Sequence, residues 1–86
     1  MIKRFKSKET ARIFNREYSP KLPPSLQRVA LRKLLMIDAA LTINDLRVPP
    51  ANRLEQLKGA RRGQHSIRIN DQWRICFTWH QGDAYD

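Results

Sequence analysis

The chain has few cysteines and glycines and no long apolar run, and each shortage excludes a class of protein. A single cysteine, Cys76, rules out an internal disulfide framework. Three glycines, at positions 59, 63 and 82, form neither a dinucleotide-binding nor a P-loop pattern. The longest aliphatic run extends only from Leu34 to Ile37, whereas a membrane span needs ~20 apolar residues. The first ten residues lack the apolar core of a signal peptide, so we expect a cytoplasmic protein that does not bind membranes.

Acidic residues are also scarce. The 86 residues contain 17 Lys and Arg against 8 Asp and Glu, which gives a net charge of +9. Such an excess is typical of a protein that binds nucleic acid, although a basic surface that only confers solubility fits equally well. The length fits one domain, which we expect to span residues 1–86.

The stretch from Gln64 to His80, QHSIRINDQWRICFTWH, predicts two strands joined by a short turn. In the second strand apolar residues occupy every other position, as expected of a half-buried strand. A two-residue turn would mix the apolar and polar faces, whereas a three-residue turn at Asn70 to Gln72 keeps them separate. This register gives the apolar face the pairs Ile69 with Trp73, Ile67 with Ile75 and His65 with Phe77.

The same register sets Arg68 directly opposite Arg74 on the other face. Like charges that face each other across two strands are unfavourable, by roughly the 0.2–1 kcal/mol that such pairs contribute. We therefore expect an anionic group between them. Because His65 and Cys76 fall on opposite faces, we expect no metal site, and nothing in the chain indicates a cofactor.

The N-terminal half predicts two helices. Ser7 is a suitable N-cap for a helix over about Lys8 to Arg16, and Pro23 and Pro24 suit the start of a second helix over about Ser25 to Ala40. The expected buried residues are Ala11, Phe14 and Tyr18 in the first helix and Leu26, Val29, Ala30, Leu34, Ile37 and Leu41 in the second.

Shorter elements complete the prediction of an α+β fold, with two N-terminal helices packed on a small, mostly antiparallel sheet of four or five strands. They are a strand over Met1 to Phe5, one helical turn over Thr42 to Leu46, a strand over Asn52 to Leu57 with Leu54 inward, and a tight turn at Gln81 and Gly82 that pairs His80 with Asp83.

RNA cleavage needs cations that stabilise a charged phosphorane, a base for the 2′-hydroxyl proton and an acid for the leaving 5′-oxygen. Arg68, Arg74 and Lys58 are the candidate cations, and Lys58 is also a candidate proton donor. Glu55 is a candidate base, although a surface salt bridge near Lys58 explains it more simply.

Other residues are candidates for RNA contact. The loop from Lys58 to Gly63, KGARRG, suits phosphate binding through Arg61 and Arg62, and the alternative is an exposed basic turn. Gln64 and His80 belong to the face that carries the arginines, though His80 lies at its far end. Trp73 is the one aromatic residue with a case for base stacking, and His65 is better explained as a packed strand residue.

The run from Asn52 to Asp86, NRLEQLKGARRGQHSIRINDQWRICFTWHQGDAYD, resembles the HigB group of toxins in the RelE and ParE superfamily, and LLMIDAA and VPPANRLEQLKG fit as well. The resemblance implies a small antiparallel sheet with two N-terminal helices. It also implies a ribosome-dependent endoribonuclease that cuts mRNA, is neutralised by a helix-turn-helix antitoxin, and uses Lys58, Arg68 and Arg74 as functional cations. Position 55 is Glu where some members have His.

Two alternatives to ribosome-dependent cleavage remain: a non-catalytic module that binds RNA or antitoxin, and the less favoured gyrase poisoning of the ParE branch. HigB-like chains usually continue a few residues beyond the position of Asp86 and end in Asp-Tyr-His, whose His is a catalytic candidate. In our register residue 89 would face Arg74, so that His would reach the arginines. We expect the 86-residue form to cleave at least ~10²-fold more slowly than a form with that tail.

Overall fold

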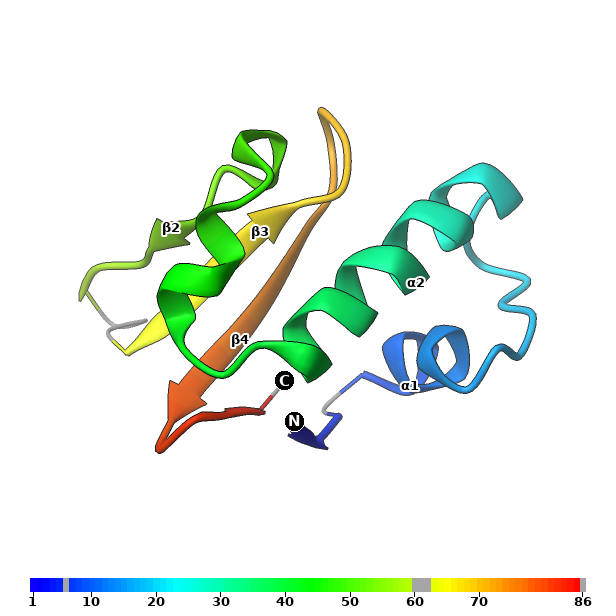
Figure 1. Ribbon diagram of the computed structural model, residues 1–86. Coiled ribbons are helices and arrows are strands. Elements are labelled where there is room, and N and C mark those ends of the chain that lie inside the picture. Colours follow the sequence, from blue (N-terminus) through cyan, green and yellow to red (C-terminus); the bar gives the residue numbers. More distant parts are fainter. Residues whose placement is uncertain (6, 60–62, 86) are drawn as a thin grey trace.

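The computed structural model describes residues 1–5, 7–59 and 63–85. It is an α+β fold with a five-stranded sheet in the order β1-β5-β4-β3-β2, and in Figure 1 α2 lies between α1 and the central hairpin. The neighbours pair in antiparallel fashion except β1 and β5, which are parallel. The predicted fold class is therefore confirmed. The elements are β1 (Ile2–Arg4), α1 (Lys8–Phe14), α2 (Pro24–Ala39), the 3-10 helices η1 (Ile43–Arg47) and η2 (Pro50–Asn52), β2 (Glu55–Gln56), β3 (Gln64–Arg68), β4 (Arg74–His80) and β5 (Asp83–Tyr85).

Helix α1 begins as predicted but is shorter. The Ser7 side chain accepts a hydrogen bond from the Thr10 N–H at 3.3 Å, which satisfies one of the free N–H groups at the helix start. The helix ends at Phe14, so Tyr18 lies beyond it and is exposed. The buried residue of α1 is Ile13. The prediction that Tyr18 packs inward was wrong because it extended the helical spacing past the end of the helix.

Helix α2 supplies one wall of the core. Leu26, Ala30, Leu34 and Ile37 are buried as predicted, but Leu41 is 82% exposed. The helix ends at Ala39, and the extended backbone of Ala40 turns the next residue away from the core. Sequence reasoning also missed Lys33, a charged residue within the buried face of α2.

The predicted register of the central hairpin is confirmed. Ile67 pairs with Ile75, His65 with Phe77 and Arg68 with Arg74. The Ile69 N–H donates to the Trp73 carbonyl at 2.9 Å, so the turn comprises Asn70 to Gln72, and the Asn70 side chain accepts from the N–H groups of Gln72 and Trp73. Such a local bond from an Asn side chain stabilises a tight turn. The main core cluster comprises Ile13, Ala30, Leu34, Ile37, Ala40, Leu46, Ile67, Ile75, Phe77 and Ala84.

The predicted tight turn at Gln81 and Gly82 is also confirmed. Both residues have positive φ, 51° and 81°, as a two-residue hairpin turn requires, and His80 pairs with Asp83. Leu54 is partly buried against the core as expected, whereas β2 itself contains only Glu55 and Gln56. The 3-10 helix η1 corresponds to the predicted turn over Thr42 to Leu46.

Candidate nucleic-acid interface

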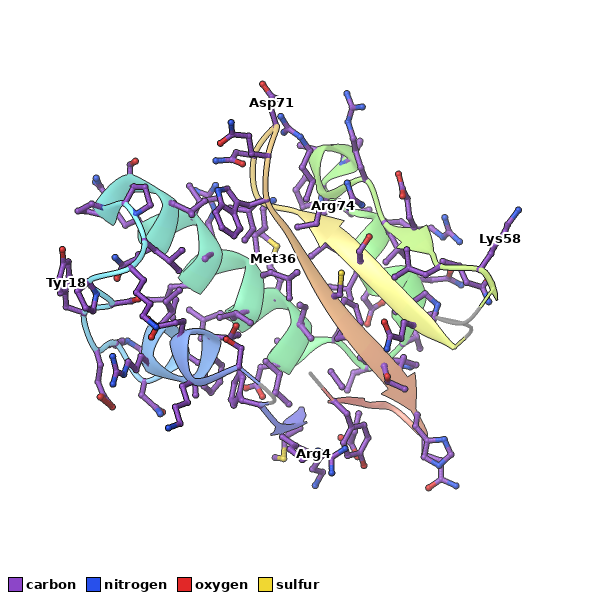
Figure 2. The ribbon with its side chains drawn as sticks, turned by 180° about the vertical axis from the view of Figure 1, so that it is seen from behind. Arg4, Tyr18, Met36, Lys58, Asp71 and Arg74 are labelled. Atoms are coloured by element: carbon purple, nitrogen blue, oxygen red, sulfur yellow. The ribbon has the colours of Figure 1, made fainter. Side chains whose placement is uncertain are left out.

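The face of the sheet opposite α2, here called the outer face, carries most of the polar strand residues. Side chains of paired residues point to the same side, so the pairs Glu55 with Ser66 and Ser66 with Cys76 share this face with Arg68 and Arg74. Both arginines are half-buried, and neither packs into the core. The register therefore gathers two guanidinium groups and one carboxylate within three adjacent strands, and Figure 2 views the sheet from this side.

Arg74 is held by three hydrogen bonds and one ion pair. Its Nε–H donates to Ser66 Oγ at 2.9 Å, and its Nη2 donates to the Arg53 carbonyl at 2.5 Å and more weakly to the Ser66 carbonyl at 3.3 Å. The same Nη2 lies 4.0 Å from Glu55 Oε1. These contacts engage Nε and Nη2 of the guanidinium. Nη1 has no protein partner among the described residues. The N–H groups of Nη1 remain available for a charge-assisted bond to a phosphate.

Arg68 is held differently, by an ion pair with Asp71 in the turn after β3. We had expected an anion between Arg68 and Arg74, but each arginine has its own carboxylate partner, Asp71 for Arg68 and Glu55 for Arg74. The protein itself therefore relieves much of the repulsion between the two cations. The Asp71 side chain is almost fully exposed, so its pairing with Arg68 is readily broken when a stronger anion arrives.

Lys58 lies apart from the arginines. In Figure 2 it extends outward from the segment after β2, away from Arg74, and it lines a shallow hollow of about 430 Å³ with Gln56, Leu57 and Gly59. The predicted surface salt bridge of Glu55 is confirmed, and its partner is Arg74.

The other candidate RNA contacts occupy different places. Gln64 lies on the outer face opposite Thr78, and His80 is exposed at the far end of β4, opposite Asp83. Trp73 is 45% exposed but lines a groove of about 460 Å³ together with Leu22 and Leu34, on the helix side of the hairpin. Arg74 and Cys76 line the same groove, so Trp73 shares it with one of the two arginines. Arg61 and Arg62 lie outside the described residues.

His65 occupies the apolar side as expected. Its ring stacks on Phe77 with centroids 6.1 Å apart, and its buried Nδ1 has no hydrogen-bond partner among the described residues. Burial, with a smaller contribution from the nearby Arg47, lowers the pKa of His65 below its usual value. The neutral ring packs here, which makes His65 a structural residue in this arrangement.

Sequence reasoning missed Ser66 and Arg53 as parts of the site. Ser66 is 1% exposed although it lies on the outer face, because Arg74 covers it. Its position two residues before Arg68 on the same face of β3 was a usable signal, since a small hydroxyl residue leaves room for a large neighbour. Arg53 contributes a backbone carbonyl, which no sequence pattern reveals.

Residues 1–5, 7–59 and 63–85 contain no group of three or more His, Cys, Asp or Glu side chains that could hold a metal ion. Within the same ranges, no helix has both the length and the apolar character needed to cross a membrane.

Comparison with known proteins identifies relatives along almost the whole chain. Residues 3–86 match the family model of the RelE-like toxin of type II toxin-antitoxin system HigB. The chain is 46% identical over 63 residues to Toxin HigB-1 of Vibrio cholerae, an alignment that covers 73% of this chain and 66% of that protein. It is 35% identical over 85 residues to Endoribonuclease HigB of Proteus vulgaris, with 99% and 91% covered.

A third relative, an uncharacterized protein of Haemophilus influenzae, is 44% identical over 64 residues, which cover 74% of this chain and 63% of that protein. The alignments thus span slightly under two thirds of the Vibrio and Haemophilus relatives and most of the Proteus relative. The family match, by contrast, extends over residues 3–86, which include both helices and strands β2 to β5. The chain belongs to the RelE-like toxins of the HigB type II toxin-antitoxin systems.

Proposed function

We propose that this chain is a toxin that cleaves mRNA on the ribosome, with the outer face of the β3–β4 hairpin as its phosphate-binding site. The observation that carries this proposal is the pair Arg68 and Arg74, two guanidinium groups directly opposite each other in the sheet. The name of the Proteus relative, an endoribonuclease, supports RNA as the substrate. The ribosome as the place of cleavage rests on the family resemblance.

The proposed reaction is attack by the 2′-hydroxyl on the adjacent phosphorus. The 2′-oxygen forms a bond to phosphorus as its proton passes to a base, and the bond from phosphorus to the 5′-oxygen breaks as that oxygen gains a proton. The products are a 2′,3′-cyclic phosphate and a free 5′-hydroxyl. Negative charge builds up on the non-bridging oxygens in the transition state, where fixed cations stabilise it more than they stabilise the substrate.

Arg74 is the residue best placed for this role. Its contacts to Ser66 and Arg53 fix the guanidinium before substrate arrives, and preorganised donors need no rearrangement during the reaction. Arg68 supplies a second cation once Asp71 is displaced, and Lys58 binds the RNA backbone farther along. Glu55, close to Arg74 and exposed, serves as the base.

A type II system implies an antitoxin partner, and we propose that a helix-turn-helix antitoxin neutralises this chain. The strongly basic composition favours an acidic binding surface on that partner. Binding of the purified partner would be expected to weaken with salt.

The test is single-turnover cleavage of ribosome-bound mRNA by the purified chain, with the ends of the products identified chemically. We expect cuts that carry 2′,3′-cyclic phosphate, and a large loss of cleavage in the double variant Arg68→Ala/Arg74→Ala. The matched control is Arg4→Ala/Arg28→Ala, which removes two exposed cations from β1 and α2. Binding to RNA without cuts would overturn the enzymatic proposal in favour of a binding module, and cleaved DNA trapped with gyrase would point to the ParE-type activity.

A further inference from the structure

Lys33 is a buried cation, 5% exposed, in the face of α2 that packs on the sheet. Its Nζ donates to the side-chain carbonyl of Asn52, and no carboxylate in the described part of the chain forms an ion pair with it. Burial, then the charges of Arg32 and Arg68, lower the pKa of Lys33. A buried charge without an opposite charge costs stability, so its presence in a small core calls for a function.

Asn52 connects this cation to the 3-10 helix η2. It is fully buried, and besides the contact with Lys33 its Nδ2 donates to the Leu46 carbonyl at 3.2 Å and contacts Met36 Sδ at 3.8 Å. Its backbone N–H also donates to the Pro49 carbonyl at 3.0 Å. These contacts fix the end of η2 against α2 and η1.

The next residue turns the chain toward the outer face. Arg53 adopts the left-handed conformation, with φ 45° and ψ 56°, and its N–H bonds to the Pro50 carbonyl at 3.0 Å. A residue other than glycine enters this region at a cost and stays there only when its surroundings hold it. In this conformation its carbonyl accepts from Arg74 Nη2 at 2.5 Å.

We propose that Lys33 and Asn52 are positioning residues for Arg74, acting through the backbone carbonyl of Arg53. The contacts form a continuous path from the buried face of α2 to the outer face of the sheet. Lys33 bonds Asn52, which precedes Arg53 in the chain. The Arg53 carbonyl then accepts from Arg74. The role in catalysis rests on the proposed RNA cleavage, whereas the fixing of the Arg74 guanidinium does not.

Without the Arg53 carbonyl, the contacts of Arg74 with described residues are its hydrogen bonds to Ser66 and its 4.0 Å ion pair with Glu55. The guanidinium then gains freedom to rotate about its side-chain bonds. A catalytic group displaced by 1 Å can lower a rate by roughly 10²-fold. We expect at least about a tenfold loss of cleavage from a change at Lys33 or Asn52, which lie on the far side of the sheet from the substrate.

The experiment follows Arg74 directly by measuring hydrogen exchange of its Nη2–H groups, which bond the Arg53 carbonyl, by NMR alongside single-turnover cleavage. Lys33→Met removes the charged group and keeps the apolar stem, and Asn52→Ala removes the link. Each should speed Nη2–H exchange at least about fivefold, the factor expected for one lost hydrogen bond, and reduce cleavage at least about tenfold with little change in RNA affinity. Lys8→Met, an exposed change on α1, is the matched control and should alter neither readout.

Arg53→Gly tests whether the backbone carbonyl of Arg53 or its charged side chain holds Arg74. It removes the charge but retains the carbonyl and permits the left-handed conformation, so Arg74 should exchange as in the parent protein. Unchanged Nη2–H exchange in folded Lys33→Met and Asn52→Ala would overturn the proposal. If the parent protein cleaves no RNA, the proposed function fails while this exchange measurement still decides the positioning role.

A reciprocal measurement covers the case in which neither core variant folds. Coupling between two sites acts equally in both directions, so Arg74→Ala, a change at a half-buried surface position, should speed exchange of the Asn52 side-chain amide. The control is Arg28→Ala, on the exposed side of α2. Equal amide exchange in the parent, Arg74→Ala and Arg28→Ala would overturn the proposal independently of any change in the core.

Discussion

Arg74 covers Ser66: the guanidinium Nε–H donates to the serine hydroxyl at 2.9 Å, and the serine is almost completely buried although it points to the outer face of the sheet. Replacing Ser66 with alanine removes this acceptor. We expect Ser66→Ala to lower the free energy of unfolding by about 1 kcal/mol, the usual net value of one hydrogen bond, measured by urea denaturation. Ser25→Ala, at an exposed position in α2, should change stability by less than about 0.5 kcal/mol.

Arg74→Lys tests whether geometry or charge matters at this position. Lysine keeps the positive charge, but a single ammonium group cannot reproduce the bonds that the guanidinium makes to Ser66 and Arg53 while it also faces a phosphate. We expect single-turnover cleavage to fall by roughly 10²-fold, as when one preorganised donor is lost, with RNA affinity changed far less. Arg28→Lys is the control, and equal rates in parent and Arg74→Lys would show that charge alone suffices.

Much of this outer face could be predicted from the sequence because a strand repeats every two residues. Once the turn at Asn70 to Gln72 was chosen, the pairing of Arg68 with Arg74 followed from the alternation of apolar residues in β4, and the structure confirms it. The capping by Ser7 was readable for a similar reason, since the signal lies within a few neighbouring residues.

Contacts between distant segments were not predictable in this way. Arg74 meets the Arg53 carbonyl 21 positions away, and Lys33 meets Asn52 across 19 positions. Neither contact leaves a periodic pattern in the sequence, and a lysine within a helix is by default expected to be exposed to solvent. The ends of helices were similarly ambiguous, because the spacing that placed Tyr18 and Leu41 inward continues past the last helical residue.

The salt dependence of RNA binding should separate two groups of arginines. Arg68→Ala and Arg74→Ala should each weaken RNA binding by roughly 1.5–3 kcal/mol, because each removes a charge-assisted bond. Arg61→Ala and Arg62→Ala should mainly lower the slope of log affinity against log salt, by about 0.7 for each lost phosphate contact with a single strand. Fluorescence anisotropy over a salt series measures both quantities, and equal small effects in all four variants would indicate a diffuse basic surface.

His65 should make stability depend on pH. The folded protein lowers the pKa of this histidine, chiefly by burial, so the unfolded chain binds its proton more readily. The stabilisation is therefore complete above the unfolded pKa of about 6.5 and is lost as the pH falls through the lower folded pKa. Thermal unfolding over a pH series should show this loss in the parent protein and in His80→Phe, and a weaker pH dependence in His65→Phe. An identical pH dependence in all three proteins would exclude His65 as the source.

Glu55→Gln tests whether Glu55 is the base for the 2′-hydroxyl proton or only the ion-pair partner of Arg74. Its carboxylate is 61% exposed and lies 4.0 Å from Arg74 Nη2, close enough to the phosphate site to accept the 2′-hydroxyl proton. Glu55→Gln keeps the size of the side chain but removes its capacity as a base. If Glu55 is the base, single-turnover cleavage should fall at least ~10²-fold, the low end of the contribution of such a group.

The same substitution should also remove a negative charge beside the RNA phosphates, so affinity should stay equal or rise. The expected result for a base is therefore slower cleavage together with undiminished binding, a combination that general damage to the site does not produce. Glu17→Gln, at an exposed position after α1, controls for the change in net charge. Tighter binding with an unchanged cleavage rate would instead identify Glu55 as an ion-pair partner that holds Arg74 until RNA arrives, and the proton acceptor would then be another group.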